Sequence, residues 1–381
     1  MKKIAIITTH PIQYQIPLFK NFKKKNIICD VFFASKHGFK SKEKDKELNV
    51  KFNWEVDKNL FSGYKFFFSK GQKKSIYNFN LNFKDLEKYL KKKDYDALLF
   101  FGWNNLLYLK AFFLAKKLNI KTILRVETNL ENKLSIIKRI FKPLILKNFF
   151  KFIDYFLYIG TLNKNFYQEL EVPERKLYYS PYFVDHKFFK KVSNKKLLRK
   201  KYNLTSKKIV LFVGKFIERK RPLDFLKLAN YYKNNKDIKF VMIGDGELMK
   251  DCKEFIKMKS LANVSILGFC NQKVTRDIYN ITDVLILPSE YDTWGLVINE
   301  AMSCGVSVVS SAQCGASYDL IKNKNTGFVY DNKNFKVLLR KFDVLIKNSK
   351  KIVKYKKNSK LLISQFTYSK TIDSINKILN K

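Results

Sequence analysis

The chain has few of the residues that build metal and disulfide sites. It contains three histidines, His10, His37 and His186, so a histidine metal cluster is not expected. Its five cysteines are odd in number and form no C-x-x-C pair. Together with the lack of a signal-peptide pattern, this favours a reducing, cytoplasmic compartment.

Long hydrophobic runs and acidic residues are also scarce. The opening run IAIIT is too short for a secretory core or a membrane span and indicates a buried parallel strand. The chain has 33 Asp and Glu against 76 Lys and Arg, a formal net charge of +43. This excess favours an anionic partner, either nucleic acid or an anionic membrane surface. Against nucleic acid stand the dispersal of lysine along the chain and the lack of a helix-turn-helix, RNA-recognition or zinc signature.

One segment combines basic character with aromatic and aliphatic residues. It is NKLSIIKRIFKPLILKNFFKFIDYFLYIG, residues 132–160. Pro143 interrupts it and lysines recur, so it does not have the composition of a transmembrane helix. Two interpretations remain: an amphipathic segment at an anionic membrane surface, or a core helix with an ordinary basic outer face.

The strongest motif is PSEYDTWGLVINEAMSCG, which follows the apolar run ITDVLIL. Apolar residues at helical spacing come next, so Asp292 to Gly295 are predicted where a strand ends and a helix begins. Such a junction presents free N–H groups and the positive end of a helix dipole, which suit the phosphates of a nucleotide. Glu300, in the helix, can accept hydrogen bonds from two neighbouring ribose hydroxyls. The alternative is an ordinary helix start with solvated or capping carboxylates.

A basic loop precedes this motif. KKIVLFVGKFIERKRPLDFLKLA predicts a strand that delivers Gly214, then Lys215 and Lys220, into a loop before a helix. Cations placed there suit a diphosphate. Arg219 and Arg221 flank these lysines and could take either role, and the alternative is a solvated charged loop.

Glycine turns continue the pattern between these two motifs. KFVMIGDGELMKDCKEF predicts a strand, a turn at Gly244 and Gly246, and a helix. NVSILGFCNQ then supplies a short strand that ends at Gly268 and Phe269. From about residue 207 to 330 strands and helices alternate, which predicts a parallel sheet with ligands at the carboxyl ends of its strands.

In the N-terminal half, polar residues also follow predicted strands. His10 and Gln13, in HPIQY, come after IAIIT, either as cleft residues or, for the histidine, as a local cap. Arg125 and Glu127 end the strand TILRVETN, as cleft residues or as a buried ion pair. The DYD at 94–96 precedes ALLFFGW and is expected to start that strand, so it does not imply a divalent metal.

Taken together, these motifs resemble the retaining glycosyltransferases of family 4, which have the GT-B fold. In that family a carboxylate opens the main motif and a glutamate closes it eight positions later, as Asp292 and Glu300 do here. The family usually has glutamate and phenylalanine where this chain has Asp292 and Trp294. Lys215 and Lys220 match its G-K/R-x-x-x-x-K element. The HPIQY loop resembles a subgroup that acts in bacterial surface-polysaccharide synthesis, and the Arg125 to Glu127 stretch resembles its "rgE" variant.

The resemblance implies an α/β GT-B fold, with two Rossmann-like lobes facing a central cleft and a C-terminal helix crossing back to the first lobe. A length of 381 residues suits two domains. Residues 1–185 with 363–381 would bind the acceptor, and residues 186–362 the nucleotide sugar.

The resemblance also implies a function. The chain would transfer a sugar, with retention, from a UDP- or GDP-linked donor to a glycan or lipid-linked acceptor in bacterial surface-polysaccharide synthesis. It would need no metal and no cofactor, and would work in the cytoplasm at the inner face of the cytoplasmic membrane. The alternative is a basic nucleic-acid- or membrane-binding protein on an inactive GT-B scaffold.

The residues that the resemblance assigns fall into three groups. The catalytic candidates are Lys215, Lys220, Asp292, Glu127 and His10. The donor-binding candidates are Gly214, Lys215, Lys220, Gly244, Gly246, Gly268, Phe269, Asp292, Thr293, Trp294, Gly295, Leu296 and Glu300, with the base near Gly268 and Phe269. The acceptor-side candidates are His10, Gln13, Arg125 and Glu127.

Overall fold

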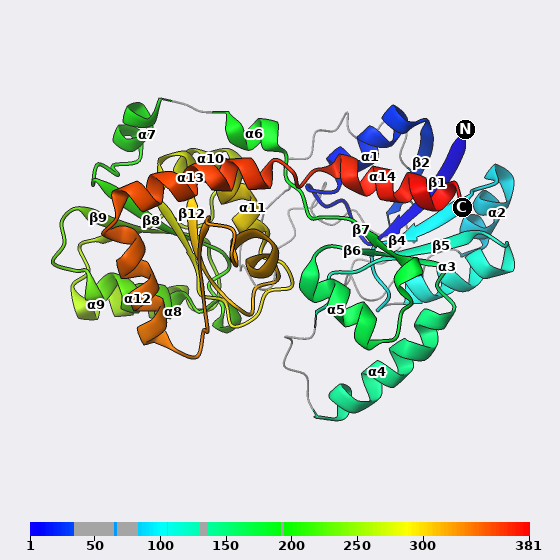
Figure 1. Cartoon of the computed structure of the whole chain (residues 1–381), viewed down its shortest axis with the longest axis horizontal. Coiled ribbons are helices and arrows are strands. Elements are labelled where there is room, and N and C mark those ends of the chain that lie inside the picture. Colours follow the sequence, from blue (N-terminus) through cyan, green and yellow to red (C-terminus); the bar gives the residue numbers. More distant parts are fainter. Residues whose placement is uncertain (34–64, 67–82, 105, 130–135, 192–193) are drawn as a thin grey trace. The chain divides into compact units, whose positions relative to one another are not determined.

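The computed structural model describes residues 1–33, 65–66, 83–104, 106–129, 136–191 and 194–381 (Figure 1). His37 therefore lies outside the described residues. Within them the chain divides into two compact units. The first consists of residues 1–182 and 367–381, and the second of residues 183–366.

The first unit is built on a parallel sheet with the strand order β3-β2-β1-β4-β5-β6-β7. Helices cover both faces of such a sheet, which explains why its central strands are continuous apolar runs. The strands are β1 (Lys2–Thr8), β2 (Ile27–Phe33), β3 (Lys65–Phe66), β4 (Ala97–Phe100), β5 (Lys121–Arg125), β6 (Tyr155–Tyr158) and β7 (Leu177–Tyr179).

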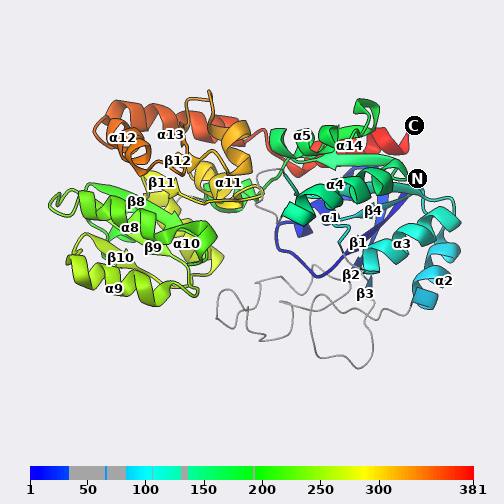
Figure 2. The same cartoon turned by 90° about the horizontal axis from the view of Figure 1, so that it is seen from below.

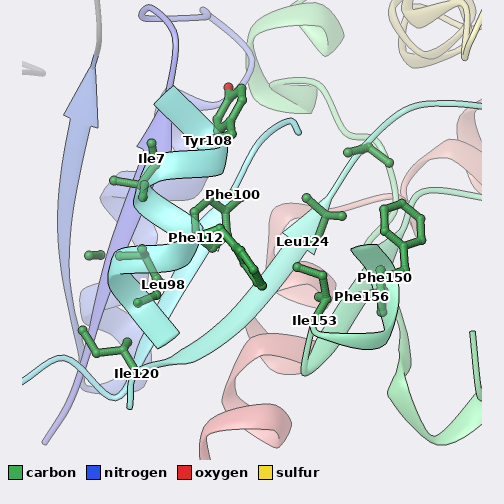
Figure 3. Packing of buried hydrophobic residues seen from close by; sticks show 14 of the residues in the cluster. Ile7, Leu98, Phe100, Tyr108, Phe112, Ile120, Leu124, Phe150, Ile153 and Phe156 are labelled. Atoms are coloured by element: carbon green, nitrogen blue, oxygen red, sulfur yellow. The ribbon is translucent and has the colours of Figure 1, made fainter. Parts of the chain in front are cut away.

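Side chains alternate between the two faces of this sheet. Ile7, Leu98 and Phe100 join one core with Phe112 and Phe150, as Figure 3 shows. The helices of the unit are α1 (Ile16–Asn21), α2 (Phe83–Lys93), α3 (Leu106–Lys117), α4 (Ile136–Lys151), α5 (Thr161–Glu169) and α14 (Tyr368–Leu379).

Helix α14 is the predicted C-terminal helix that returns to the first lobe. It contacts α1 and β7, and Ser374 donates a hydrogen bond to the carbonyl of Tyr179 (2.5 Å). Figure 1 shows α14 beside α1, although almost the whole sequence separates these two helices. Its apolar side chains, among them Ile372 and Ile375, are buried.

The second unit has a six-stranded parallel sheet with the order β10-β9-β8-β11-β12-β13. This confirms the parallel sheet predicted from about residue 207 to 330. The strands are β8 (Lys208–Val213), β9 (Ile238–Ile243), β10 (Val264–Ile266), β11 (Val284–Leu287), β12 (Ser307–Ser311) and β13 (Gly327–Tyr330).

Helices again cover the second sheet. Phe212 and Phe240 pack with Phe225 of α8 and Phe342 of α12 in one large core. The helices are α6 (His186–Lys190), α7 (Lys195–Lys201), α8 (Pro222–Tyr231), α9 (Met249–Lys259), α10 (Gln272–Ile281), α11 (Leu296–Ser303), α12 (Phe335–Ile346) and α13 (Ser349–Ile363).

Three local expectations need adjustment. Segment 132–160 is not one amphipathic unit: residues 132–135 lie outside the described residues, α4 follows, and the end of the segment is strand β6, where Phe156 and Leu157 are fully buried. Strand β10 ends at Ile266, two residues before Gly268. Between β12 and β13, the predicted alternation of strands and helices is met only by a single π-helical turn, η5 (Ser317–Ile321).

The DYD stretch lies where the sequence predicts it, immediately before β4. Asp96 accepts hydrogen bonds from the backbone N–H of Lys3 (2.7 Å) and from the ammonium of Lys2 (3.2 Å). Tyr95 donates to Asp30 (2.5 Å). These contacts tie the amino ends of β1 and β4 together, which is a structural role.

Candidate functional site

The predicted donor residues gather at the carboxyl edge of the second sheet. Strands β8 and β11 are neighbours there, and the strand order reverses between them. Open parallel sheets bind ligands at such a switch point. The loops that follow β8 and β11 are joined by a hydrogen bond from the Glu290 N–H to the Arg219 carbonyl (2.7 Å).

An ion pair crosses this switch point. The Lys220 ammonium donates to Oδ2 of Asp292, and the two side chains are 14% and 13% exposed. Lys220 ends the short 3-10 helix η4 (Glu218–Lys220) after β8, and Asp292 follows β11. Two donor-binding candidates from different loops therefore contact each other directly.

The four basic residues of the β8 loop separate into different environments. Arg221 has partners other than Asp292, the carboxylate that Lys220 contacts. Its guanidinium donates to the Asn332 carbonyl (2.7 Å) and pairs with Asp224 (2.6 Å). Its backbone is left-handed (φ 51°) and precedes Pro222 at the first position of α8. Arg221 thus has partners other than Asp292, whereas Lys220 contacts Asp292 directly.

The backbone of residues 292–295 is fixed by the segment that follows β12. Asp292 and Cys314 form a parallel bridge, with hydrogen bonds from the Asp292 N–H to Gln313 (3.2 Å) and from the Gly315 N–H to Asp292 (3.1 Å). A Cβ added at Gly315 would lie 2.2 Å from the Thr293 carbonyl oxygen. Glycine is therefore needed at 315 for this close backbone approach.

The buried thiol of Cys314 takes part in the same junction. It donates to the Trp294 carbonyl (2.8 Å). Burial, and then the charge of Asp292, raise the pKa of Cys314 to about 12, so the thiol stays protonated at neutral pH. It is a structural donor in this junction.

Trp294 has an internal partner. Its side chain is 3% exposed, and the indole N–H donates to Oδ1 of Asn299 (2.8 Å), one turn into α11. Gly295 caps α11 with a left-handed backbone (φ 91°), and Leu296 begins the helix. The Trp294 side chain therefore stabilises the start of α11, where the N–H groups are presented.

Glu300 lies in the middle of α11 and is almost fully buried. The hydroxyl of Tyr279, a buried residue of α10, donates to its Oε2 (3.0 Å). This hydrogen bond fixes one carboxylate oxygen. An ionised carboxylate is an acceptor with about four acceptor positions in all.

The glycines of the GDG turn allow two loops to pack backbone to backbone. A Cβ at Gly244 (φ 143°) would lie 1.8 Å from the Gly214 carbonyl oxygen, and one at Gly246 (φ 154°) 2.6 Å from that of Phe216. The Phe216 N–H donates to Asp245 (2.9 Å). These glycines are required by the protein itself, because they hold the β8 loop in place.

Gly268 differs from the glycines of that turn. A Cβ added there would meet no heavy atom within 4 Å, although the backbone is left-handed (φ 71°). The Gly244 N–H donates to the Gly268 carbonyl (2.9 Å), which joins this position to the same edge. Phe269, the next residue, is 42% exposed. The chain is thus accessible where the base was expected.

The acceptor-side candidates lie at the carboxyl edge of the first sheet. Its strand order reverses between β1 and β4, and His10 and Gln13 follow β1. Nδ1 of His10 lies 3.0 Å from the hydroxyl of Thr9. Both candidate residues are partly exposed.

Arg125 and Glu127 form a connected polar group after β5. The Arg125 guanidinium is 4% exposed, donates to the Ser180 hydroxyl (3.1 Å), and lies 3.9 Å from Oε1 of Glu127. It also stacks over Phe101 (5.5 Å) and Tyr182 (4.9 Å), and the Tyr182 hydroxyl donates to Glu127. Burial lowers the pKa of Arg125, while Glu127 opposes this shift. The ion pair exists, but the Glu127 side chain is 40% exposed and remains accessible for chemistry.

Within each unit, then, the structure brings the predicted residues to one sheet edge. Sequence reasoning missed their supporting partners, namely Tyr279, Asn299, Cys314 and Tyr182. Asn299 lies inside the main motif, five residues after Trp294, but its residue type alone does not predict an indole partner. The other three lie outside the quoted motifs and are identified only by contacts between separate elements. Among the described residues, no three His, Cys, Asp or Glu side chains are grouped as metal ligands.

Helix α4 exposes apolar side chains on the first unit. Leu144 and Ile145 are 57% and 67% exposed. Phe152, the residue after α4, is 64% exposed, and Phe113 of α3 is 65% exposed. Rings of α3 and α4 touch, and Figure 2 shows the two helices side by side on one face of the sheet. In the part of the chain that the structure describes, every helix is too short or too polar to cross a membrane.

Comparisons with known proteins agree with the motifs of the second unit. Residues 194–362 match the family model described as "Glycosyl transferases group 1". Over 174 residues the chain is 34% identical to the UDP-Gal:alpha-D-GlcNAc-diphosphoundecaprenol alpha-1,3-galactosyltransferase of Escherichia coli, covering 43% of each protein. Over 134 residues it is 30% identical to the alpha-D-kanosaminyltransferase of Streptomyces kanamyceticus, covering 35% of this chain and 34% of that protein. The matches thus span less than half of either relative.

Among solved structures, the fold resembles that of Alr3699/HepE from Anabaena, determined in complex with UDP. The TM-score is 0.76, and the match covers 100% of both chains at 15% sequence identity. The predicted two-lobe α/β fold of the GT-B class is therefore confirmed.

Proposed function

We propose that this chain is a retaining glycosyltransferase of family 4. It would transfer a sugar from a UDP- or GDP-linked donor to a glycan or lipid-linked acceptor in bacterial surface-polysaccharide synthesis. The matched E. coli relative, whose name includes a diphosphoundecaprenol-linked sugar, supports an acceptor of this kind. The HPIQY loop supports the polysaccharide subgroup.

One observation carries the proposal most directly. At the switch point of the second sheet, a cation and two carboxylates, Lys220, Asp292 and Glu300, lie on loops and a helix that begin at neighbouring strand ends. A cation suits the diphosphate, a buried carboxylate suits paired ribose hydroxyls, and a second carboxylate suits sugar hydroxyls. Few ligands other than a nucleotide sugar need all three at once.

The proposed reaction requires no protein nucleophile. The acceptor oxygen bonds to the anomeric carbon on the face from which the diphosphate leaves, and the acceptor proton passes to a diphosphate oxygen. Lys215, Lys220 and the start of α11 would stabilise the charge that develops on the leaving diphosphate, which is electrostatic catalysis. Glu300 would hold the ribose and Asp292 the sugar, while His10, Gln13, Arg125 and Glu127 would serve the acceptor side.

The first test is a thermal-shift screen of the purified chain against UDP, GDP, ADP, CMP and their common sugars. Stabilisation by one nucleotide that is lost in Glu300→Ala supports the donor site and identifies the base. The matched control is Glu254→Ala, which removes an exposed carboxylate of α9. Glu300→Ala and Lys220→Ala should also sharply lower transfer in a folded protein. Wild-type turnover in both variants would refute the site assignment.

The exposed side chains of α3 and α4 support a second part of the proposal, peripheral association with the inner face of the cytoplasmic membrane. Apolar residues beside basic ones suit an interface rich in anionic lipid. Leu144→Ser with Ile145→Ser should reduce sedimentation with phosphatidylglycerol vesicles. Val353→Ser with Leu361→Ser changes equally exposed residues of α13 and should not. Equal binding by both double variants would refute this docking surface.

The alternative remains a basic binding protein on an inactive scaffold. It would be favoured if no nucleotide stabilises the chain while an oligonucleotide or anionic lipid does. Oligonucleotide binding of that kind would weaken steeply with salt.

A further inference from the structure

The ion pair between Lys220 and Asp292 has a consequence for what the site prefers to bind. Both side chains are largely removed from solvent, at 14% and 13% exposed. Lys220 and Asp292 belong to different loops, so their contact does not arise from closeness in sequence. A diphosphate oxygen that approaches Lys220 must therefore share or displace the carboxylate of Asp292.

The position of Asp292 is fixed by backbone contacts. Its N–H and carbonyl both pair with the segment around Cys314, at 3.2 and 3.1 Å. The side chain is short, and its carboxylate reaches the ammonium from this anchored backbone. The contact between Lys220 and Asp292 is therefore determined by the fold around residue 292.

Separating a shielded ion pair leaves each charge in need of a new partner, because an uncompensated charge away from water is strongly unfavourable. A nucleotide sugar offers both partners: diphosphate oxygens for the lysine, and sugar hydroxyls that donate to the carboxylate. A free nucleoside diphosphate offers only the first. Its terminal phosphate also carries additional negative charge, which the carboxylate repels.

We infer that Asp292 competes internally for Lys220, so that the site discriminates against the free nucleoside diphosphate relative to the nucleotide sugar. This inference rests on the proposed function. After transfer has removed the sugar, the carboxylate returns to the ammonium and favours release of the diphosphate product. Asp292 is then a specificity-determining residue in addition to a sugar contact.

The test is calorimetric binding of UDP, UDP-glucose, GDP and GDP-mannose to the full chain. Asp292→Asn removes the competing charge and nearly keeps the shape. Whichever of UDP and GDP the wild type binds should bind about tenfold more tightly to this variant than to the wild type, as expected for one close charge pair. The affinity for the matching nucleotide sugar should gain less, because its hydroxyl contact is weakened at the same time.

Two controls separate the ion pair from a general charge effect. Asp237→Asn removes the same charge from an exposed pair with Lys207 (3.1 Å), at the amino end of β9, and should leave both affinities unchanged. In a Lys220→Met background, Asp292→Asn should keep only the part of its effect that comes from direct repulsion of the phosphate, so the gain for the free diphosphate should be clearly smaller. If Asp292→Asn does not fold, Asp292→Ser carries the same expectation.

The outcomes are distinguishable. If UDP or GDP binds the wild type and Asp292→Asn binds it no tighter, the inference is wrong and the proposed function stands. The inference is equally wrong if the gain in affinity is undiminished without Lys220. If none of the four compounds binds either protein, the proposed function fails and the inference falls with it.

Discussion

Tyr279→Phe tests whether Glu300 is held in position for a ligand. The substitution removes only the hydroxyl that donates to Oε2 of Glu300 (3.0 Å). The ring of Tyr279 is fully buried and packs against Phe189 (6.3 Å between centroids). Phenylalanine keeps that packing, so the perturbation is confined to one hydrogen bond.

The magnitude follows from the charge and burial of the acceptor. A hydrogen bond to an ionised group contributes about 1.5–3 kcal/mol, and Glu300 is only 6% exposed, so water replaces the lost donor poorly. We expect a loss of about 2 kcal/mol in the free energy of unfolding of the second unit. For a unit of this size that lowers Tm by roughly 4–8 °C. A less firmly oriented carboxylate should also weaken nucleotide binding by about 1 kcal/mol, roughly fivefold.

A matched variant separates stability from positioning. The Tyr232 hydroxyl also donates to a carboxylate in the same unit, Oδ1 of Asp343 (2.8 Å), away from the candidate site. Tyr232→Phe should lower Tm, by less because Asp343 is more exposed, and should leave nucleotide affinity unchanged. Denaturation measures the stability of both variants, and calorimetry measures their affinity for the nucleotide. Unchanged nucleotide affinity in Tyr279→Phe, or an equal loss in both, would refute the positioning role.

Three further predictions concern other parts of the fold. Gly244→Ala should lower the free energy of unfolding by more than about 3 kcal/mol or prevent folding, because its Cβ would lie 1.8 Å from a carbonyl oxygen. Gly268→Ala should lower it by only about 1–2 kcal/mol, from left-handed backbone strain. Urea unfolding of both variants measures the difference. Burial lowers the pKa of His186 in the folded protein. The contribution of this residue to stability is therefore complete above its unfolded pKa of about 6.5 and is lost as pH falls through the folded pKa. His186→Gln should lack this part of the pH dependence when unfolding is measured from pH ~8 to ~5. Glu127→Gln should change the free energy of unfolding by less than about 1 kcal/mol, since this carboxylate is 40% exposed, but it should lower sugar transfer. A loss of stability without a loss of transfer would show that the pair between Arg125 and Glu127 is purely structural.

The fold was largely predictable because its signals are local and repeated. Continuous apolar runs such as IAIIT and ITDVLIL, each followed by polar or glycine residues and a helical pattern, specify buried parallel strands with crossover helices. The weaker elements were less predictable. Residues 317–321 form one π-helical turn, a geometry that the sequence pattern did not indicate.

The site was predictable at the level of motifs and not of contacts. Glycine, lysine and carboxylate spacing predicted loops at strand ends, because glycine turns between apolar runs mark such loops. Which cation faces which carboxylate depends on how two loops approach each other. The sequence left four basic residues open, and only the contact of Arg221 with Asn332 and Asp224 shows that it faces elsewhere.

The two departures from the usual motif, Asp292 and Trp294, are explained by the same physical feature. The junction that carries them is held by backbone hydrogen bonds and by the close approach at Gly315, and the Trp294 side chain adds its own contact with α11. Each side chain then has its own partner, Lys220 for the carboxylate and Asn299 for the indole. A backbone-built junction can accept a shorter acid and a larger ring while keeping the start of α11 in place. Departures of this kind are therefore compatible with an unchanged fold, and an effect on ligand preference follows only if Asp292 has the donor-binding role proposed above.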